Sequence, residues 1–279
     1  MSRWRFAIVV GGLLTSSGAS GAQGSLPLSP ARERGQTVTP VFEGWYKNAD
    51  GTYSLSFGYF NRNESEVLDV PLGAANFISP APFNGTQPTQ FSPRRHWGVF
   101  AVRVPADFGT RRLTWTLVLR GDSVAIPGSL ATDWQIDALE GEAGSANTPP
   151  RLRFGPSGPE GAGPGGITGG PLSTSVGKAL TIDVWATDDG TLRPTISSGG
   201  RAGVPVALTW FTHQGPGAVT FANERPKADA SGKATTTATF SAPGDYVLRV
   251  RANDASGVEA AGHAQCCWSN AFLKVTVTR

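Results

Sequence analysis

The sequence predicts an all-β protein that is built from two β-sandwich domains joined by a Gly/Pro-rich linker. Apolar residues alternate with small or polar ones in short runs, which is the pattern of strands rather than helices. The 279 residues include 36 Gly and 21 Pro, so many turns are expected. Gly and Pro make up half of residues 141–170. Such a stretch buries too little apolar surface to offset the entropy of ordering it, and we therefore expect a linker over residues 138–170.

The first 22 residues predict a signal peptide. Arg3 and Arg5 precede an apolar run at 6–14, and small residues up to Ala22 form a cleavage site. The apolar run is far shorter than the roughly 20 residues that a membrane-spanning helix needs. The sequence thus predicts no membrane span and an exported protein, periplasmic or extracellular after cleavage, with a flexible lead over residues 23–39.

Charge argues against a nucleic-acid partner. Loss of Arg3 and Arg5 lowers the Lys and Arg count from 24 to 22, against 21 Asp and Glu, so the mature chain is nearly neutral. Nucleic-acid binding needs clustered Lys and Arg, and the remaining charges alternate in sign.

Residues 40–137 predict the first β-sandwich domain. Tyr53, Leu55, Phe57 and Tyr59 alternate with small residues, and Gly51 occupies a hairpin turn where a positive φ is expected. Several short strands separated by turns indicate a sandwich or barrel. The expected strands are 41–48, 52–61, 66–72, 97–104, 112–120 and 123–126.

Residues 171–279 predict the second sandwich, with the clearest alternation in the chain. Trp210 and Tyr246 lie on two of its strand patterns. Seven strands are the number found in an immunoglobulin-like sandwich, which is the fold we expect here. The strand patterns lie at 171–176, 180–184, 206–210, 219–221, 234–240, 245–253 and 270–278.

The second domain also resembles a known group of repeats. Asn-Thr-Pro-Pro at 147–150 and Leu-Thr-Ile-Asp-Val-Trp-Ala-Thr-Asp-Asp-Gly at 180–190 resemble the opening of PKD-type and cadherin-like repeats in bacterial surface proteins. Ala-Pro-Gly-Asp-Tyr-Val-Leu-Arg-Val at 242–250, followed by Asn-Asp-Ala-Ser-Gly at 253–257, resembles their closing strand. The resemblance implies an immunoglobulin-like or PKD-like sandwich and says little about function, because this scaffold serves many roles.

Single positions refine that resemblance. Trp210 stands where immunoglobulin-like domains place a core Trp, and Tyr246 stands where they place a corner Tyr. Leu248 replaces the Cys expected two residues later, so no inter-sheet disulfide is implied. In the first domain, Phe-Glu-Gly-Trp-Tyr at 42–46 resembles segments of uncharacterised bacterial secreted proteins, which imply no function.

Cys266 and Cys267 are the only two cysteines and are adjacent. An oxidising compartment favours a vicinal disulfide, two separately packed thiols are the alternative, and an intermolecular bridge is a third option. With His263 they offer the soft donors that suit copper or zinc. A fourth ligand is missing from the pattern, and a solvated loop histidine is the plainer interpretation.

Asp188, Asp189 and Asp254 follow expected strands. In the cadherin-like repeats that the domain resembles, such acids hold calcium. The alternative is that Asp-Asp-Gly and Asn-Asp-Ala-Ser-Gly are turn sequences, in which Asp and Asn bond to nearby backbone.

No sequence motif of a nucleophile elbow, a zinc protease or a phosphate loop is present, so no catalytic residues are assigned. Trp115 and Trp210 are expected in the cores. Trp45, Tyr46 and Trp97 lie near turns, where they either pack in the core or stack on sugars or a partner protein.

An immunoglobulin-like order gathers the segments 188–203, 222–232 and 254–269 at one end of the second domain, and the last of them contains Trp268. The alternative for Trp268 is that it closes the end of the core, with Cys266 and Cys267 packed beside it. We therefore expect an exported, non-catalytic binding or structural module that presents this end to a protein or glycan at the cell surface or in the periplasm. The alternative function is a carbohydrate-binding accessory protein or a weak secreted hydrolase.

Overall fold

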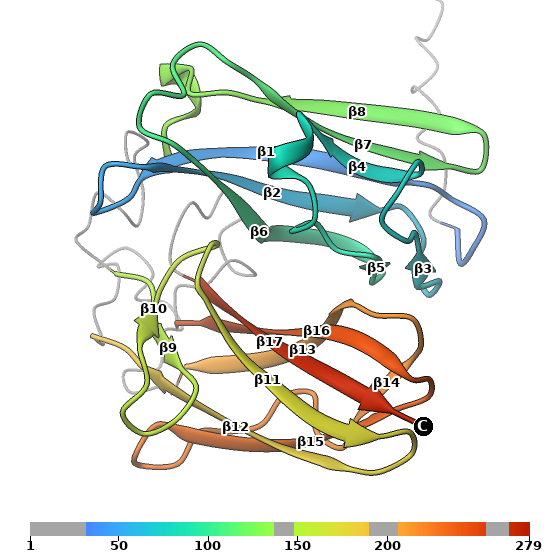
Figure 1. Cartoon of the computed structure of the whole chain (residues 1–279), viewed down its shortest axis with the longest axis vertical. Helices are drawn as coiled ribbons and strands as arrows, with labels where there is room; N and C mark the ends of the chain where they lie inside the picture. The colour runs from blue at the N-terminus through green and yellow to red at the C-terminus, as the bar shows by residue number, and fades with distance from the viewer. Residues whose placement is uncertain (1–31, 137–147, 190–205, 255–267) are drawn as a thin grey trace, which may run out of the picture. The chain divides into compact units, whose positions relative to one another are not determined.

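The computed structural model describes residues 32–136, 148–189, 206–254 and 268–279, all within one compact unit that starts at Ala31 (Figure 1). Strands dominate, and the only described helical turns are the short η1 (Ala81–Phe83) and η2 (Thr132–Trp134). The predicted all-β class is confirmed. In the described ranges, no helix is both long enough and apolar enough to cross a membrane.

The first sandwich consists of two three-stranded sheets and a small two-stranded pair. One sheet has the order β1-β2-β6, from strands Val38–Lys47, Tyr53–Asn61 and Arg94–Val104. The other has the order β4-β7-β8, from strands Asn76–Ser79, Leu113–Leu119 and Asp122–Gly128. Strand β3 (Leu68–Asp69) pairs with β5 (Gln90–Phe91). The expected strand 66–72 is thus only two residues long, and β4 and β5 were not predicted.

Aromatic packing holds the first sandwich together, as the alternation in β2 predicted. Leu55 and Phe57 are fully buried, and Phe57 contacts Phe100 and Trp115. The Trp115 indole NH donates a 3.0 Å hydrogen bond to Asn76 Oδ1, so the buried ring leaves no orphaned donor. The predicted core position of Trp115 is confirmed.

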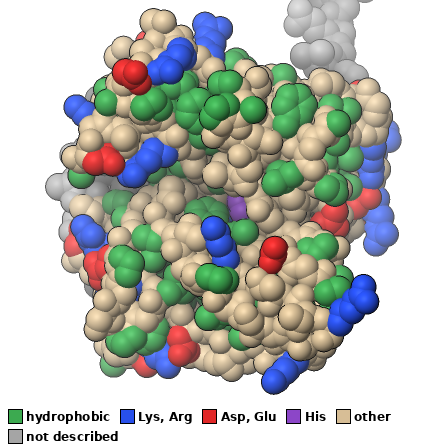
Figure 2. Space-filling model, in the orientation of Figure 1, with side chains coloured by type: hydrophobic (Ala, Val, Ile, Leu, Met, Phe, Trp, Pro, Cys, Tyr) green, Lys and Arg blue, Asp and Glu red, His purple; other side chains and the backbone are tan. Residues whose placement is uncertain are grey.

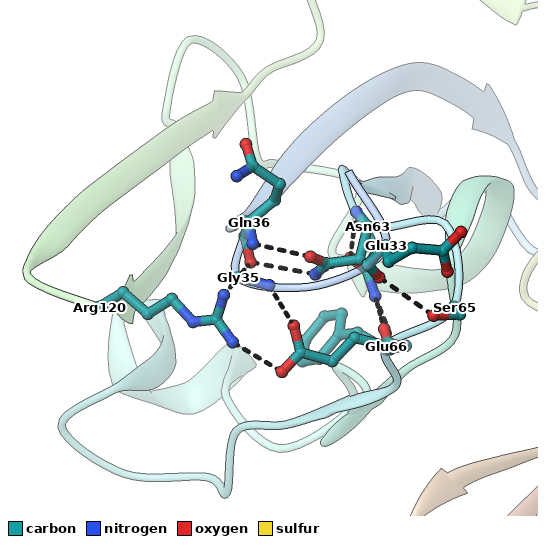
Figure 3. A network of polar contacts seen from close by, with 9 residues as sticks. Glu33, Gly35, Gln36, Asn63, Ser65, Glu66 and Arg120 are labelled. Carbon is teal, nitrogen blue, oxygen red and sulfur yellow. Dashed lines mark hydrogen bonds and ion pairs between the residues drawn. The ribbon is translucent and has the colours of Figure 1, made fainter. Parts of the chain in front are cut away.

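The end of the expected flexible lead is fixed to this sandwich by a polar network (Figure 3). The side-chain amide of Asn63 accepts from Gln36 N at 2.7 Å and donates to Gln36 O at 3.0 Å. Glu66 accepts from Gly35 N at 2.8 Å and forms an ion pair with Arg120 at 2.7 Å. The Gly35 hydrogen bond is the largest of the interactions that lower the pKa of Glu66. Residues 23–31 lie outside the described part of the chain.

The second sandwich pairs a five-stranded sheet with a four-stranded one. The five-stranded sheet has the order β10-β9-β12-β15-β14, from strands Glu160–Gly161, Arg151–Arg153, Leu180–Thr187, Lys233–Phe240 and Val219–Phe221. The four-stranded sheet has the order β11-β17-β16-β13, from strands Ile167–Ser175, Trp268–Thr278, Gly244–Asn253 and Ala207–Gln214. Strand β11 runs parallel to β17, and all other pairs in this sandwich are antiparallel.

Two sequence expectations about this sandwich are confirmed. Strand β16 pairs with both the Trp210 strand and the C-terminal strand. The Tyr246 hydroxyl donates a 2.8 Å hydrogen bond to Ala242 O just upstream, and Trp210 is 2% exposed in the core. The immunoglobulin-like interpretation of this sandwich rests on these contacts.

The expected linker differs from the structure. Strands β9 and β10 lie within residues 138–170, and β11 begins at Ile167. Leu152 on β9 is fully buried in the second core, and β9 pairs with β12 through backbone hydrogen bonds. A short edge strand needs only backbone hydrogen bonds and one apolar side chain that packs in the core. Neither requirement is visible in the composition of a Gly/Pro-rich stretch, so the strand was not predicted. Residues 138–147 lie outside the described part.

The sheet β11-β17-β16-β13 is buried on both faces over part of its width. One face carries Leu248 and Val250 into the second core. On the other face, Phe272 belongs to the hydrophobic cluster of the first sandwich. Arg249 and Arg251 lie on this same outer face and are 2% and 5% exposed. This outer face and the surface of the first sandwich that covers it are called the seam below.

Candidate functional site at the seam

Strand β13 contacts the first sandwich through a set of backbone and amide hydrogen bonds. His213 O accepts from Thr89 N at 2.8 Å. The Gln214 side-chain amide donates to Gly85 O at 2.9 Å and to Gln87 O at 2.7 Å. These bonds fasten strand β13 to the segment 85–89 of the first sandwich, and the buried groups among them are thereby satisfied.

A second group of contacts lies where strand β17 begins. The Trp268 ring packs on Gly98, whose φ is 45°, and a Cβ at that glycine would lie 2.2 Å from the ring. The Asn270 side-chain amide donates to Gly98 O at 2.6 Å and to Pro164 O at 2.9 Å. Trp268 and Asn270 therefore fix the first residues of β17 to strand β6.

Three hollows open between the described parts of the two sandwiches. One of them, about 610 Å³ in volume, is lined by Pro71, Leu72, Gly215 and Pro216 among others. The other two lie along the seam. The first, about 400 Å³ in volume, includes His213, Phe272 and Lys274 in its lining, and Figure 2 shows a hollow of this kind with a histidine inside it. The second has a volume of about 440 Å³, within the range of small-molecule sites. We call it the arginine hollow, and its characteristic lining residues are Arg95, His96, Trp97, Phe211, Arg225 and Arg251.

A buried ion pair positions Arg95 at the wall of the arginine hollow. Arg95 Nη2 lies 2.8 Å from Glu43 Oε1, and its guanidinium stacks 3.8 Å from the Trp97 ring centre. Burial raises the pKa of Glu43, and the Arg95 charge only partly offsets that rise. A Cβ on Gly58 would meet Glu43 at 2.0 Å, so the glycine in the alternating pattern of β2 provides the room for this pair.

His96, which also lines the arginine hollow, is held as a neutral ring. Its Nε2 faces Pro93 O at 3.0 Å, so this nitrogen carries the proton, and the buried, unprotonated Nδ1 has no hydrogen-bond partner. The ring stacks on Tyr59 at 4.9 Å. Burial, followed by the positive charge of Arg249, lowers the pKa of His96 to about 3. Burial also raises the pKa of Tyr59 to about 12.

Arg249 is the deepest charge of the site. Its Nη1 donates a 3.0 Å hydrogen bond to Asn270 Oδ1, and its guanidinium lies 4.3 Å from the Phe211 ring centre. Its Nε has no hydrogen-bond partner, and no carboxylate of the described residues lies within ion-pair distance of it. Burial, followed by repulsion from Arg251, lowers the pKa of Arg249 to about 9, so the group is still charged at neutral pH.

The histidines of the seam are poor general bases. His213 Nε2 faces Thr86 O at 2.8 Å, and burial lowers the pKa of this histidine to about 3. A ring that protonates only near pH 3 accepts a proton weakly at neutral pH, where a general base works best with a pKa near 7. The geometry therefore offers binding contacts at these two positions rather than acid–base chemistry.

The residues that the sequence suggested for a site are only partly described. His263, Cys266 and Cys267 lie outside the described residues. Trp268 is 2% exposed and packs on Gly98, so its ring is part of the seam rather than an exposed binding surface. The hypothesis that Trp268 contacts a ligand directly is therefore not supported.

The acids proposed for calcium lie at strand ends, as expected. Asp188 and Asp189 are exposed directly after β12, and Thr148 Oγ1 donates a 2.5 Å hydrogen bond to Asp189 Oδ2. Asp254 is buried directly after β16. Among the residues with described positions, no three His, Cys, Asp or Glu side chains gather as a metal site.

The aromatic residues near turns divide between the two interpretations. Trp45 is buried, and its indole NH donates a 2.7 Å hydrogen bond to Ala131 O. Tyr46 is half-buried, and its hydroxyl accepts from Gly165 N at 3.1 Å. Trp97 is half-buried and lines the arginine hollow.

Sequence reasoning missed the arginines of the site. The signal for Arg249 and Arg251 was their alternation with Leu248 and Val250, which places the two arginines on the strand face opposite the second core. The signal for Arg95, His96 and Trp97 in the lining of the arginine hollow was the dense Arg-Arg-His-Trp run at 94–97.

Comparison with known proteins finds similarity among solved structures. No family model matches the chain, and no curated protein matches it, so the PKD-like resemblance stays an expectation. The chain is similar to the D00–D0 domain of intimin at 12% identity and a TM-score of 0.30, covering 87% of this chain and 100% of that one. The Yersinia pseudotuberculosis adhesin InvE gives 14% identity and a TM-score of 0.27, covering 86% of this chain and 58% of that one. TM-scores of this size support no inference about function.

Proposed function

We propose that this protein is an exported, non-catalytic binding module in which the first sandwich fixes the orientation of the second. The observation that carries the proposal is the anchoring of strand β17 at its first residues, where Trp268 and Asn270 bind Gly98. Contacts of this kind exclude water and leave few rotatable groups, so the two sandwiches behave as a rigid support.

The support holds the end at which we expect a partner. Ala186 N donates to Gly232 O at 2.9 Å, so β12 ends where β15 begins. Ala207, Asn253 and Trp268 are paired across three adjacent strands. We expect the loops of the partner-binding end to join these strand ends, and an anchored support reduces the entropy lost when such loops bind. We propose a protein or glycan partner at the cell surface or in the periplasm.

The test is a binding screen of the mature chain against immobilised glycans and envelope proteins. Residues 255–267 are replaced by a Gly-Ser segment of equal length in one variant, and the exposed residues 109–112 are replaced in the same way in a control. We expect the first replacement to abolish partner binding while the control retains it. Partner binding that survives the first replacement contradicts the proposal.

The oxidation state of Cys266 and Cys267 bears on the same partner-binding end. We propose that they form a vicinal disulfide that stiffens the segment before Trp268. Mass spectrometry of the exported protein gives their state. The Cys266→Ser, Cys267→Ser double variant is expected to weaken partner binding, and lost stability with unchanged binding would make the pair purely structural.

A further inference from the structure

The first hollow along the seam, about 400 Å³ in volume, contains a buried histidine that the binding proposal above does not use (Figure 2). We call it the histidine hollow. His213 lies in its lining and is 3% exposed. The centre of the His213 ring lies 5.0 Å from that of Phe272 and 6.4 Å from that of Phe100, and both phenylalanines also line the hollow. The base of the hollow is therefore formed by three buried rings.

One ring nitrogen of His213 has no partner. Nε2 faces Thr86 O at 2.8 Å, so this nitrogen carries the proton. Nδ1 is then an acceptor, and it is buried without a hydrogen-bond partner. Burial lowers the pKa of His213 to about 3, so the ring is neutral and Nδ1 remains an acceptor at neutral pH. A buried acceptor without a donor is unfavourable, and a ligand that brings a hydroxyl group into the hollow would satisfy it.

A lysine adds a positive charge at the rim of the hollow. Lys274 is exposed, and its amine forms no hydrogen bond or ion pair with any described residue. No Asp or Glu is found in the described lining, so the charge of Lys274 is not balanced there. The histidine hollow therefore combines an unpaired cation with an apolar base, which favours an anion that has an apolar body.

The strand register sets the spacing between the two polar groups. Val247 on β16 is paired with Gln214 on one side and with Lys274 on the other. His213 and Lys274 thus belong to strands that are two strand spacings apart, or about 10 Å. An aromatic ring with polar groups at opposite positions fits between side chains at this spacing, and Phe100 and Phe272 offer it an aromatic surface.

We propose that the histidine hollow binds a small aromatic carboxylic acid that carries a hydroxyl group on its ring, such as 4-hydroxybenzoate. In this arrangement the hydroxyl group donates to His213 Nδ1, the ring lies against Phe100 and Phe272, and the carboxylate pairs with Lys274. The volume is at the lower end of the range of small-molecule sites, as expected for a ligand with a single ring. This small-molecule site is separate from the partner-binding end, because none of the strand ends named there lines it.

The experiment is isothermal titration calorimetry of the mature chain with 4-hydroxybenzoate, benzoate and methyl 4-hydroxybenzoate. We expect benzoate to bind about tenfold more weakly than 4-hydroxybenzoate, because Nδ1 then has no donor. The uncharged ester should bind about threefold more weakly, because an exposed ion pair contributes little. Equal affinity for 4-hydroxybenzoate and benzoate overturns the proposal. No binding of 4-hydroxybenzoate at millimolar concentration, or equal affinity for the acid and its ester, also overturns it.

Variants locate the binding in the histidine hollow. His213→Gln keeps a donor for Thr86 O but removes the Nδ1 acceptor, so it should no longer distinguish 4-hydroxybenzoate from benzoate. Lys274→Gln should no longer distinguish the acid from its ester. Lys178→Gln is the matched control, because Lys178 is exposed in the turn between β11 and β12 and does not line the hollow.

The test does not depend on one variant. Lys274 is exposed, so Lys274→Gln should fold, and together with the three ligands on the wild type it carries the test if His213→Gln does not fold. Folded variants of the hollow that keep the wild-type discrimination between the ligands contradict the assignment. The same loss of discrimination in Lys178→Gln would also contradict it, because the effect would then not come from the hollow.

Discussion

The two sheets of the second sandwich show how one strand pattern leads to opposite electrostatic situations. On the outer face of the sheet β10-β9-β12-β15-β14, Asp183 and Lys233 form a 2.9 Å ion pair about one third exposed to solvent. Thr235 donates to Asp183, and Lys233 lies over Trp185. Partial burial acts to raise the pKa of Asp183, but the hydrogen bonds from Thr235 and Lys233 outweigh it, and the pKa is lowered.

On the outer face of the sheet β11-β17-β16-β13, the same alternation buries Arg249 beside Phe211. Water screens the first pair, which limits its worth to about 0–1 kcal/mol. At the seam, water is excluded and each charge needs a specific partner. The comparison shows that a polar residue which alternates with apolar residues along a strand need not be exposed to solvent. Whether solvent or another sheet covers the outer face of the strand decides how much a charge on that face contributes to stability.

The largest expected effect is a loss of stability at acidic pH that comes from the buried histidines of the seam. His96 and His213 have folded pKa values of about 3, below the value of about 6.5 in the unfolded chain. The unfolded state then binds more protons between these values, so stability is full above pH 6.5 and falls as the pH drops towards 3. At pH 5 the loss is about 2 kcal/mol per histidine.

Urea unfolding at pH 7 and pH 5 measures this loss. Asp183, whose folded pKa is lowered, contributes stability that is lost only below about pH 4, so the interval from 7 to 5 reports on the seam. The double variant His96→Gln, His213→Gln should lose most of the pH dependence. A double variant that keeps the wild-type pH dependence would show that the seam histidines are not its source.

The next effect concerns the close approach of the sandwiches. Gly98→Ala places a Cβ against Trp268 at a φ of 45° and should cost about 3 kcal/mol of unfolding free energy. Gly51→Ala is the matched control, with a φ of 84° and open space, and should cost about 1 kcal/mol from backbone strain alone. Equal costs for both variants would mean that the Trp268 contact is loose.

A pair of isosteric changes compares the two ion pairs directly. Glu43→Gln leaves Arg95 charged without its carboxylate and should cost about 2 kcal/mol. Asp183→Asn on the solvent-facing sheet should change stability by no more than about 0.5 kcal/mol. Denaturant midpoints of the two variants are compared at pH 7, and a larger effect for Asp183→Asn would reverse the assignment of which face is desolvated.

The smallest expected effect has the opposite sign. Arg249→Met removes a buried charge at similar volume and should leave stability unchanged or raise it by about 1 kcal/mol. A loss of more than about 2 kcal/mol would instead show that Arg249 stabilises the seam in the absence of ligand.

Several features of the fold were determined by the sequence alone, because they depend on local pattern. The alternation around Phe57 and Leu248 predicted strands and core faces, and both are buried as expected. The position of Tyr246 predicted its hydrogen bond to the upstream backbone. Periodicity and short-range spacing are written in consecutive residues, so a single chain displays them.

Other features were decided only by the tertiary structure, because they depend on which surfaces meet. Leu152 sits in a Gly/Pro-rich stretch and still anchors an edge strand, since backbone pairing carries no compositional signal. The sequence assigned no role to Arg249, and for Trp268 it allowed either a binding surface or a plug at the end of the core; both side chains are buried in the structure. Their partners Phe211, Asn270 and Gly98 are distant in sequence or on another strand, so no local pattern could place the arginine hollow.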